Sequence, residues 1–408
     1  MFAAATADLR VLFASRLVRM FAYGLLGVVL VLHLVASGLN PSRIGLLLSL
    51  TLFGDVVISL WLSTHADRWG RRRTLVAGAL LMALGGAGMA ATRDFFLLTL
   101  AATIGVISPS GNEVGPFLAV EQAGLAQELA DRDRTAIFAW YNLAGYFATA
   151  VGALAAGGFA RLLRYENVSA VMTYRTLFWI YAAIGVGVMA LALRLSPAIE
   201  APQEKTKRAE PALFGLRESR AVVLRLSGLF ALDSFGGGFI LQSFVAWWLH
   251  ERFGAREAAL GAIFFGTNLL SGLSGLAAVP LARRFGLVNT MVWTHLPSNV
   301  LLILVPLMPD LPLAVVVLLA RHLLSQMDVP TRQSYVNAIV PANERSAANG
   351  VTSTAKQLGT ALGPLVAGPV FGAAILTGLP FFLCGGIKIA YDVLLWRAFR
   401  QHKPPEEK

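Results

Sequence analysis

A basic segment, Asp67-Arg68-Trp69-Gly70-Arg71-Arg72-Arg73, lies between two long apolar runs of this 408-residue sequence. It contains one glycine and one acid, as a tight, charged turn between two helices would. A weaker copy, Ala282-Arg283-Arg284-Phe285-Gly286, occupies the same setting in the second half of the chain. A basic turn that recurs between apolar runs predicts a duplicated bundle of membrane-spanning helices.

The composition agrees with a membrane protein. Hydrophobic residues make up 56% of the chain and charged residues only 14%, which is outside the range of soluble domains. The apolar runs are about 20 residues long, enough to cross a hydrocarbon core of roughly 30 Å. A single cysteine, Cys384, excludes an intrachain disulfide.

We predict an all-α protein of twelve transmembrane helices. The predicted spans are 12–37, 43–64, 74–91, 96–120, 135–160, 173–195, 222–249, 257–281, 287–308, 311–332, 343–374 and 379–400. Lys and Arg concentrate on the side of these spans that both termini share, so both termini are expected in the cytoplasm. The net charge of +11 therefore reflects topology, and we predict no nucleic-acid partner because no soluble basic face exists.

A polar, proline-containing stretch interrupts the apolar rhythm between spans six and seven. It divides the chain into an N-terminal six-helix bundle (1–195), a cytoplasmic linker (196–220) and a C-terminal six-helix bundle (221–408). Gly45 matches Gly261 and Gly70 matches Gly286 at one constant offset. Two halves in the same orientation predict a parallel repeat about an axis along the membrane normal.

At this point the chain resembles the major facilitator superfamily, in its twelve-span bacterial type. That family's signature is Gly-x-Leu-Ala-Asp-Arg-x-Gly-Arg-Lys-x-x-Leu in the loop between spans two and three. The residues in register here are Ala66, Asp67, Arg68, Gly70, Arg71, Arg72 and Leu75, whereas Ser63 and His65 depart from it. The resemblance implies a monomeric, multi-pass transporter of a bacterial inner (plasma) membrane that alternates between two access states.

The basic turn supplies the predicted gating motif, which is Asp67, Arg68, Gly70, Arg71 and Arg72. Asp67 can pair with an Arg of this turn or of a neighbouring span and hold the inner side closed until the halves move. Alternatively, Arg68, Arg71, Arg72 and Arg73 serve only to orient the helices in the membrane. We favour the first role for Asp67, Gly70 and Arg71, and the second for Arg72 and Arg73.

Ionisable side chains inside the predicted spans are the candidates for handling protons or substrate. Each costs at least about 2.5–3.5 kcal/mol at the bilayer centre, so it should face a cavity or a partner. The candidates are Asp55, Glu113, Asp233, Arg19, Arg321, Asp328 and Lys356. The resemblance implies that spans one, four, seven and ten line the cavity, which favours Arg19, Glu113, Asp233 and Arg321.

Several of these charges have a simpler interpretation. Lys388 and Asp392 are four residues apart on one helix, which favours a structural ion pair. Arg16 is expected to extend to the inner headgroups, and Glu121 and Asp328 are expected near solvent. Asp55 and Lys356 belong to spans that flank the interface between the halves, so they could pair there.

Span four carries an unusual concentration of helix breakers. Its sequence Ser108-Pro109-Ser110-Gly111-Asn112-Glu113-Val114-Gly115-Pro116 should interrupt the helix, and Asp328-Val329-Pro330 repeats the signal in span ten. Broken helices at matching places of two repeats indicate a binding site. A packing kink without a binding role remains the alternative.

The sequence favours transport over catalysis. Its six histidines are scattered, and it has no nucleotide-binding loop, so we predict no enzyme activity, no cofactor and no metal site. We predict a proton-coupled secondary transporter that exports a small organic compound. The alternatives are an importer or facilitator of a small organic anion and, from another class, a sensor or scaffold that no longer transports.

Overall fold

The computed structural model describes residues 6–128, 131–200, 216, 218–341, 344–374 and 378–401. Over these residues the chain is helical and forms no β-strand. Ten of the described helices are long and apolar enough to cross a membrane. The all-α prediction is confirmed, while the count of twelve spans stays a prediction.

Two of the predicted spans lie outside those ten helices. Span 96–120 is divided between two short helices, α4 (Phe95–Ile104) and α5 (Phe117–Glu128). Span 343–374 corresponds to one long helix, α14 (Arg345–Ala374), which contains Pro364 and Pro369. The predicted twelve spans and the ten helices selected by length and apolar character therefore differ at two places, a broken helix and a proline-bearing helix.

The described residues fall into two compact units, one from 1–204 and 241–268 and the other from 205–240 and 269–408. The first unit contains α1 (Ala7–Ala36), α2 (Pro41–Trp69), α3 (Arg71–Ala91), α4, α5, α6 (Asp131–Tyr165), α7 (Ala170–Leu193), α9 (Gln242–Phe253) and the beginning of α10 (Glu257–Phe285). The second contains α8 (Arg220–Gly238), the rest of α10, α11 (Leu287–Leu304), α12 (Leu311–Leu324), α13 (Asp328–Ile339), α14 and α15 (Leu379–Phe399). Short 3₁₀ turns cover Pro197–Ile199 and Val305–Leu307.

Helix starts follow the local sequence. Thr6, Asn40 and Ser169 each accept a hydrogen bond at the N-terminus of α1, α2 and α7 from a backbone N–H that has no partner within the helix. Pro41 follows at the first position of α2, where its missing N–H costs nothing. These caps fix where the membrane-spanning helices begin.

The two copies of the basic turn share one backbone device. Gly70 has φ +104° between α2 and α3, and Gly286 has φ +84° between α10 and α11. Residues with a side chain rarely adopt positive φ, so glycine is what permits so short a connection. The matched glycines of the sequence thus perform the same structural task in both units.

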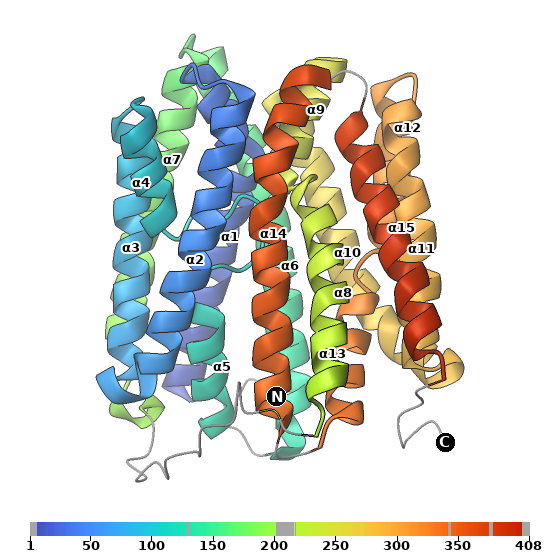
Figure 1. Cartoon of the computed structure of the whole chain (residues 1–408). Helices are drawn as coiled ribbons and strands as arrows, with labels where there is room; N and C mark the ends of the chain where they lie inside the picture. The colour runs from blue at the N-terminus through green and yellow to red at the C-terminus, as the bar shows by residue number, and fades with distance from the viewer. Residues whose placement is uncertain are drawn as a thin grey trace. The chain divides into compact units, whose positions relative to one another are not determined.

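Close helix contacts replace hydrophobic burial as the source of packing energy, because lipid is as apolar as the side chains. In the first unit α1 packs on α6, where a Cβ at Gly152 would lie 1.9 Å from the carbonyl oxygen of Phe21. In the second unit α8 packs along α14 (Figure 1), where a Cβ at Gly363 would lie 2.4 Å from Gly238 Cα. In both helix pairs a glycine lets the two backbones come into close contact.

The predicted break of span four is confirmed. Between α4 and α5 the backbone turns with positive φ at Val106, Gly111 and Gly115. The break of span ten lies between α12 and α13, as the sequence indicated. A third break, between α8 and α9, was missed, although Gly236, Gly237 and Gly238 precede it.

Residues 241–268 pack on the helices of the first unit. Ser243 N–H donates to the carbonyl of Pro109 in the broken span at 3.2 Å. A Cβ at Gly261 of α10 would lie 2.7 Å from the carbonyl oxygen of Ala153 in α6. Tyr174 Oη of α7 donates to Glu257 Oε1 at 2.7 Å. These contacts place the segment with the first unit despite its place in the sequence.

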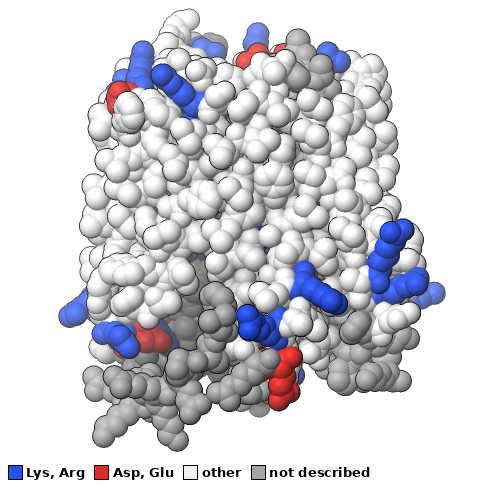
Figure 2. Space-filling model, viewed as in Figure 1, with Lys and Arg blue, Asp and Glu red and all other residues white. Residues whose placement is uncertain are grey.

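The surface has the character of a membrane protein. On the face shown in Figure 2, charged side chains gather near the helix ends, and the band between them is almost free of charge. Large apolar side chains stay exposed, such as Phe96 at 77%, Val57 at 65% and Val316 at 61%. Such exposure is expected where the solvent is lipid.

Candidate functional site

The first unit contains a buried cluster of two arginines and two glutamates, which we call the first-unit cluster: Arg16, Arg19, Glu113 and Glu121. Arg19 lies at its centre and is completely buried. Its Nε donates to Glu113 Oε1 at 2.8 Å, and its Nη1 and Nη2 donate to the two oxygens of Glu121 at 2.8 and 2.7 Å. Arg16 Nη1 completes the cluster with Glu113 Oε2 at 2.7 Å.

The surroundings of this cluster satisfy its remaining polar atoms. Tyr141 donates a short hydrogen bond to Glu121, and Ser15 Oγ donates to the same carboxylate at 3.0 Å. The guanidinium of Arg19 lies 4.2 Å from the ring centre of Phe117. Two cations therefore balance two carboxylates, which is what a dry interior requires.

Two expectations about this region were wrong. Arg16 does not reach toward a headgroup; it is buried and pairs with Glu113. Glu121 is not near solvent; it is fully buried against Arg19. The sequence indicated that these charges lay in or beside spans, but their partners are about a hundred residues away in the chain.

Asp55 of α2 holds the irregular part of span four. Its Oδ1 accepts from Gly115 N–H at 2.6 Å and from Ser59 Oγ at 3.0 Å. The break leaves backbone N–H groups without hydrogen-bond partners in a helix. The Asp55 carboxylate is the hydrogen-bond acceptor for one of them, the N–H of Gly115. The geometry thus gives Asp55 a structural task and leaves its second oxygen available.

The second unit contains a larger buried group, which we call the second-unit cluster: Asp233, His295, Asp328, Arg332, Lys388 and Asp392. Asp233 of α8 accepts from Lys388 Nζ at 2.7 Å and lies 3.4 Å from Arg332 Nη2. Arg332 also pairs closely with Asp328, one helical turn before it. Asp328 is buried, so the expectation that solvent reaches it was wrong.

Asp392 is paired differently from the other two carboxylates. Its Oδ1 lies 2.8 Å from His295 Nδ1, and its Oδ2 accepts from Asn299 Nδ2 at 2.9 Å. The predicted ion pair between Lys388 and Asp392 is wrong, because Lys388 reaches Asp233 on α8 instead. Among the described residues, the side chains that hydrogen-bond to Asp392 are His295 and Asn299, and neither carries a permanent charge.

His295 joins the two acids. While Nδ1 faces Asp392, Nε2 lies 3.8 Å from Asp233 Oδ1. His295 was not among the sequence candidates, although a histidine in the middle of span nine was the available signal. Arg332 was missed because span ten was expected to end there.

A metal ion is a poor fit for these acids. Donor atoms of Asp233, His295 and Asp328 lie within 4.8 Å of one another. However, Lys388 and Arg332 already contact the carboxylates of Asp233 and Asp328. A divalent ion would have to share that space with two cations, so we interpret the group as an ion-pair network.

Two further cations of the second unit lack a carboxylate partner among the described residues. Arg321 Nη1 lies 3.2 Å from His322 Nε2, and its Nε has no hydrogen-bond partner. Lys356 on α14 is half-buried and forms no ion pair with a described residue.

The basic turn is held by the residues that follow α7. Asp67 Oδ1 accepts from Arg71 Nε at 2.9 Å, so the predicted acid–base pair forms within the turn itself. Arg71 Nη1 also donates to Gln127 at 2.8 Å and to the carbonyl of Ile199 at 3.1 Å. Glu200 accepts from Arg71 N–H at 2.5 Å and caps the start of α3.

The remaining members of the predicted motif lie at the edge of this contact. Arg72 N–H donates to Glu200 at 3.3 Å, and Arg72 Nη2 donates to the carbonyl of Leu193 at 2.6 Å. Arg68 is exposed. Arg72 thus ties the turn to the end of α7, a contact beyond its expected role in topology.

Broken helices around buried ion pairs, on two similarly packed helical units, define a class of polytopic membrane transporters. A family model described as Major Facilitator Superfamily matches residues 12–247 and 227–408. The chain belongs to this superfamily, which confirms the resemblance noted in the sequence. It is a multi-pass integral membrane transporter.

Known relatives cover almost the whole chain. The uncharacterized membrane protein YJR124C of Saccharomyces cerevisiae is 32% identical over 423 residues, covering 97% of this chain and 94% of the relative. The quinolone resistance protein NorA of Staphylococcus aureus is 23% identical over 390 residues, 93% of each chain. The crystal structure of the nucleoside transporter NupG matches with a TM-score of 0.73 at 15% identity, covering 97% of this chain and 100% of that one.

Proposed function

We propose that the protein is a proton-coupled secondary transporter that exports a small organic compound by alternating access. The observation that carries this proposal is the His295–Asp392 pair. It is a buried acid–base contact at 2.8 Å, and no Lys or Arg of the described segments forms an ion pair with this carboxylate. Such a pair can hold a proton in one access state and release it in the other.

The neighbours of this pair determine what a proton would change. The charged and titratable groups that contact His295 or its acidic neighbours are Asp233 on α8, Asp328 and Arg332 on α13, and Lys388, Tyr391 and Asp392 on α15. A proton on His295 strengthens its attraction to Asp233 as well as to Asp392. Lys388 and Arg332 already contact the carboxylate of Asp233. They would then share it with a third cation, the protonated His295.

The substrate is proposed to carry an anionic group. Arg321 and Lys356 are both partly buried and have no carboxylate partner among the described residues. A buried guanidinium without a counter-ion is costly, and a substrate carboxylate or phosphate would relieve that cost. This observation equally favours the second candidate, an importer or facilitator of a small organic anion.

Export is the proposed direction, and a similarity to a resistance protein supports it. The relative NorA is described as a quinolone resistance protein, which fits removal of a compound from the cell. The domain division at 196–220, a monomeric state, cytoplasmic termini and a bacterial inner-membrane location remain part of the proposal. They rest on the charge pattern and on the resemblance described above.

The proposal is tested in proteoliposomes with an imposed proton gradient. Candidate substrates come from comparing the metabolites taken up by inverted vesicles with and without the protein. We expect Asp392→Asn and His295→Gln to abolish gradient-driven accumulation while exchange of substrate down its own gradient continues. Uphill transport that persists in both variants and in the double variant would remove this pair as the proton carrier.

A further inference from the structure

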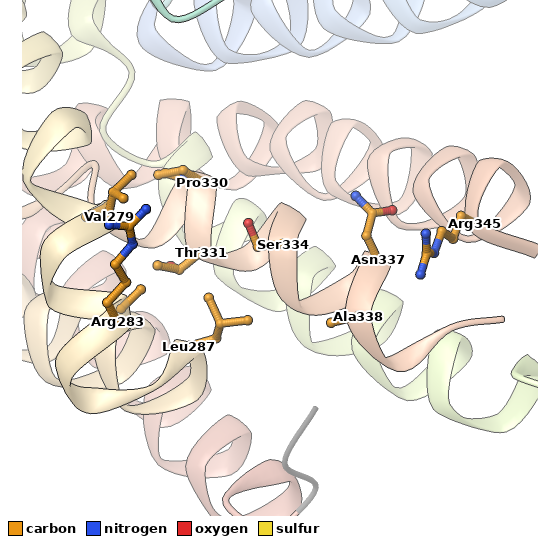
Figure 3. A pocket seen from close by; sticks show the side chains of 11 residues that line it. Val279, Arg283, Leu287, Pro330, Thr331, Ser334, Asn337, Ala338 and Arg345 are labelled. Atoms are coloured by element: carbon orange, nitrogen blue, oxygen red, sulfur yellow. The ribbon is translucent and has the colours of Figure 1, made fainter. Parts of the chain in front are cut away.

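A cavity of about 590 Å³ lies within the second unit, apart from the second-unit cluster. It is lined by the end of α10, the first residue of α11, one face of α13 and the first residue of α14. Figure 3 shows Arg283 and Arg345 on either side of Ser334 and Asn337. Pockets of roughly 300–1,000 Å³ accommodate small molecules or large parts of them.

The cavity is basic, and its charge is not neutralised. None of its eleven lining residues is acidic, whereas two, Arg283 and Arg345, are permanently charged. Within the described part of the chain, neither arginine takes part in an ion pair. Both are exposed, so a ligand can reach them.

The duplicated turn explains why this cavity lacks an acid. Arg283 occupies the position that Asp67 has in the first copy, and Leu287 occupies that of Arg71. In the first unit Asp67 and Arg71 pair at 2.9 Å, and Glu200 covers the start of α3. The second copy has exchanged the acid for a cation, so its turn contains no acid that could pair with Arg283.

The nearby acids are already committed. Glu344, next to Arg345, is buried and accepts from Ser219 Oγ at 2.5 Å and from Glu218 N–H at 2.9 Å. It thereby holds the residues just before α8, and it does not line the cavity. Asp328 precedes the lining residue Pro330 but pairs with Arg332. Neither carboxylate therefore serves the two cavity arginines.

Uncharged donors add to the attraction. Asn337 Oδ1 accepts from Asn349 Nδ2 at 2.6 Å, which leaves the Asn337 amide N–H₂ to donate toward the cavity. Ser334 contributes a hydroxyl. The cavity also includes the first residues of α11 and α14, Leu287 and Arg345, where the helix dipoles present their positive ends.

We propose that this cavity binds a phosphate-bearing group. Three helices contribute hydrogen-bond donors to the cavity: two guanidinium groups, an amide and a hydroxyl. Together these donors can use more acceptor oxygens than one carboxylate has, and a phosphate supplies more of them. The volume also accommodates the group that carries the phosphate. The phosphate can belong to an anionic phospholipid headgroup or to a soluble organic phosphate, and the site is independent of the proposed proton coupling.

The test measures binding to the purified full-length protein by native mass spectrometry and thermal unfolding. The probes are phosphatidylglycerol, the zwitterionic phosphatidylcholine and glycerol 3-phosphate. We expect wild-type protein to prefer phosphatidylglycerol over phosphatidylcholine if a lipid is the source. Stabilisation by glycerol 3-phosphate, or its competition with the lipid, identifies a soluble phosphate as a ligand of the same cavity.

Variants connect the binding to this cavity. Arg283→Gln and Arg345→Gln should each weaken binding of the preferred probe about tenfold or more, because each removes a charge-assisted contact. Arg284→Gln is the matched control: it is adjacent and exposed, but it does not line the cavity. Unchanged binding in the Arg283/Arg345 double variant, or an equal loss in Arg284→Gln, would overturn the proposal.

Discussion

Lys388 illustrates how a single buried charge selects its partner. Asp392 lies one turn away on the same helix, yet Lys388 contacts Asp233 on α8 at 2.7 Å. Both members of this pair are almost fully buried, at 10% and 7% side-chain exposure. At such sites a charge that loses its partner costs more than the intact pair contributes, because water cannot replace the lost contact.

Removing that partner gives the first prediction. Lys388→Met should lower the free energy of unfolding by about 3–5 kcal/mol, because Asp233 would keep only its longer contacts with Arg332 and His295. Asp233→Asn combined with Lys388→Met should recover much of that loss. The measurement is a double-mutant cycle of thermal unfolding in detergent. Additive effects of the two substitutions would show that the pair is not energetically coupled.

At the scale of helices, glycine contacts decide how closely neighbours approach. Gly152 and Gly158 both lie on α6, but only Gly152 faces another backbone. A Cβ at Gly152 would meet the carbonyl of Phe21, whereas a Cβ at Gly158 meets nothing within 4 Å. The α1–α6 contact is therefore sensitive to a side chain at Gly152 and indifferent to one at Gly158.

The second prediction uses these two glycines. Gly152→Ala should destabilise the protein by about 1–3 kcal/mol because it forces α1 and α6 apart. Gly158→Ala should be neutral or stabilise by up to about 1 kcal/mol, since alanine favours helix more than glycine does. Thermal unfolding of both variants in the same detergent tests this. Similar losses in the two proteins would contradict the assigned contact.

The basic turn belongs to the same scale. Asp67 is 64% exposed, so its ion pair with Arg71 contributes no more than about 0–1 kcal/mol to stability. A functional role of Asp67 must therefore lie in transport and not in stability. The structure supports a role of Asp67 that is separate from stability, because Glu200 and Gln127 hold Arg71 in place independently of Asp67.

The third prediction follows. Asp67→Asn should leave expression and the unfolding temperature close to wild type but slow transport about tenfold or more, because it removes the negative charge proposed to keep the inner side closed. Gly70→Leu should slow transport too, and it should also destabilise the turn, since φ is +104° there. Wild-type flux in correctly inserted Asp67→Asn protein would exclude a gating role.

For the whole molecule, the sequence predicts the helical architecture better than it predicts the partners of each charge. Hydropathy sets helix length, and Pro109 and Pro116 mark the break of span four. Partner choice depends on which faces of different helices meet. Sequence spacing therefore suggested Asp392 for Lys388, while the actual partner is 155 residues away. Arg16 and Glu121 were misplaced for the same reason.

The fourth prediction concerns topology. If Lys and Arg mark the cytoplasmic side, a tag joined to either terminus should be cleaved by protease in inverted vesicles and protected in right-side-out vesicles. When each terminus is tagged separately, the experiment shows whether the two termini lie on the same side of the membrane. If they do, the number of spans must be even, however the broken helices are counted. Protection of one tag and cleavage of the other in the same vesicles would require an odd number.

Residues 196–200 are held by hydrogen bonds to three helices, and this affects how movement passes through the first unit. Ser196 is tied to Asp8 of α1, Gln127 of α5 donates to the carbonyls of Ala198 and Glu200, and the Glu200 carboxylate sits on the start of α3. Residues 196–200 are therefore held to α1, α5 and the start of α3 at once. A displacement of residues 196–200 is passed to the short connection between α2 and α3, so these residues act as a tether on the turn itself.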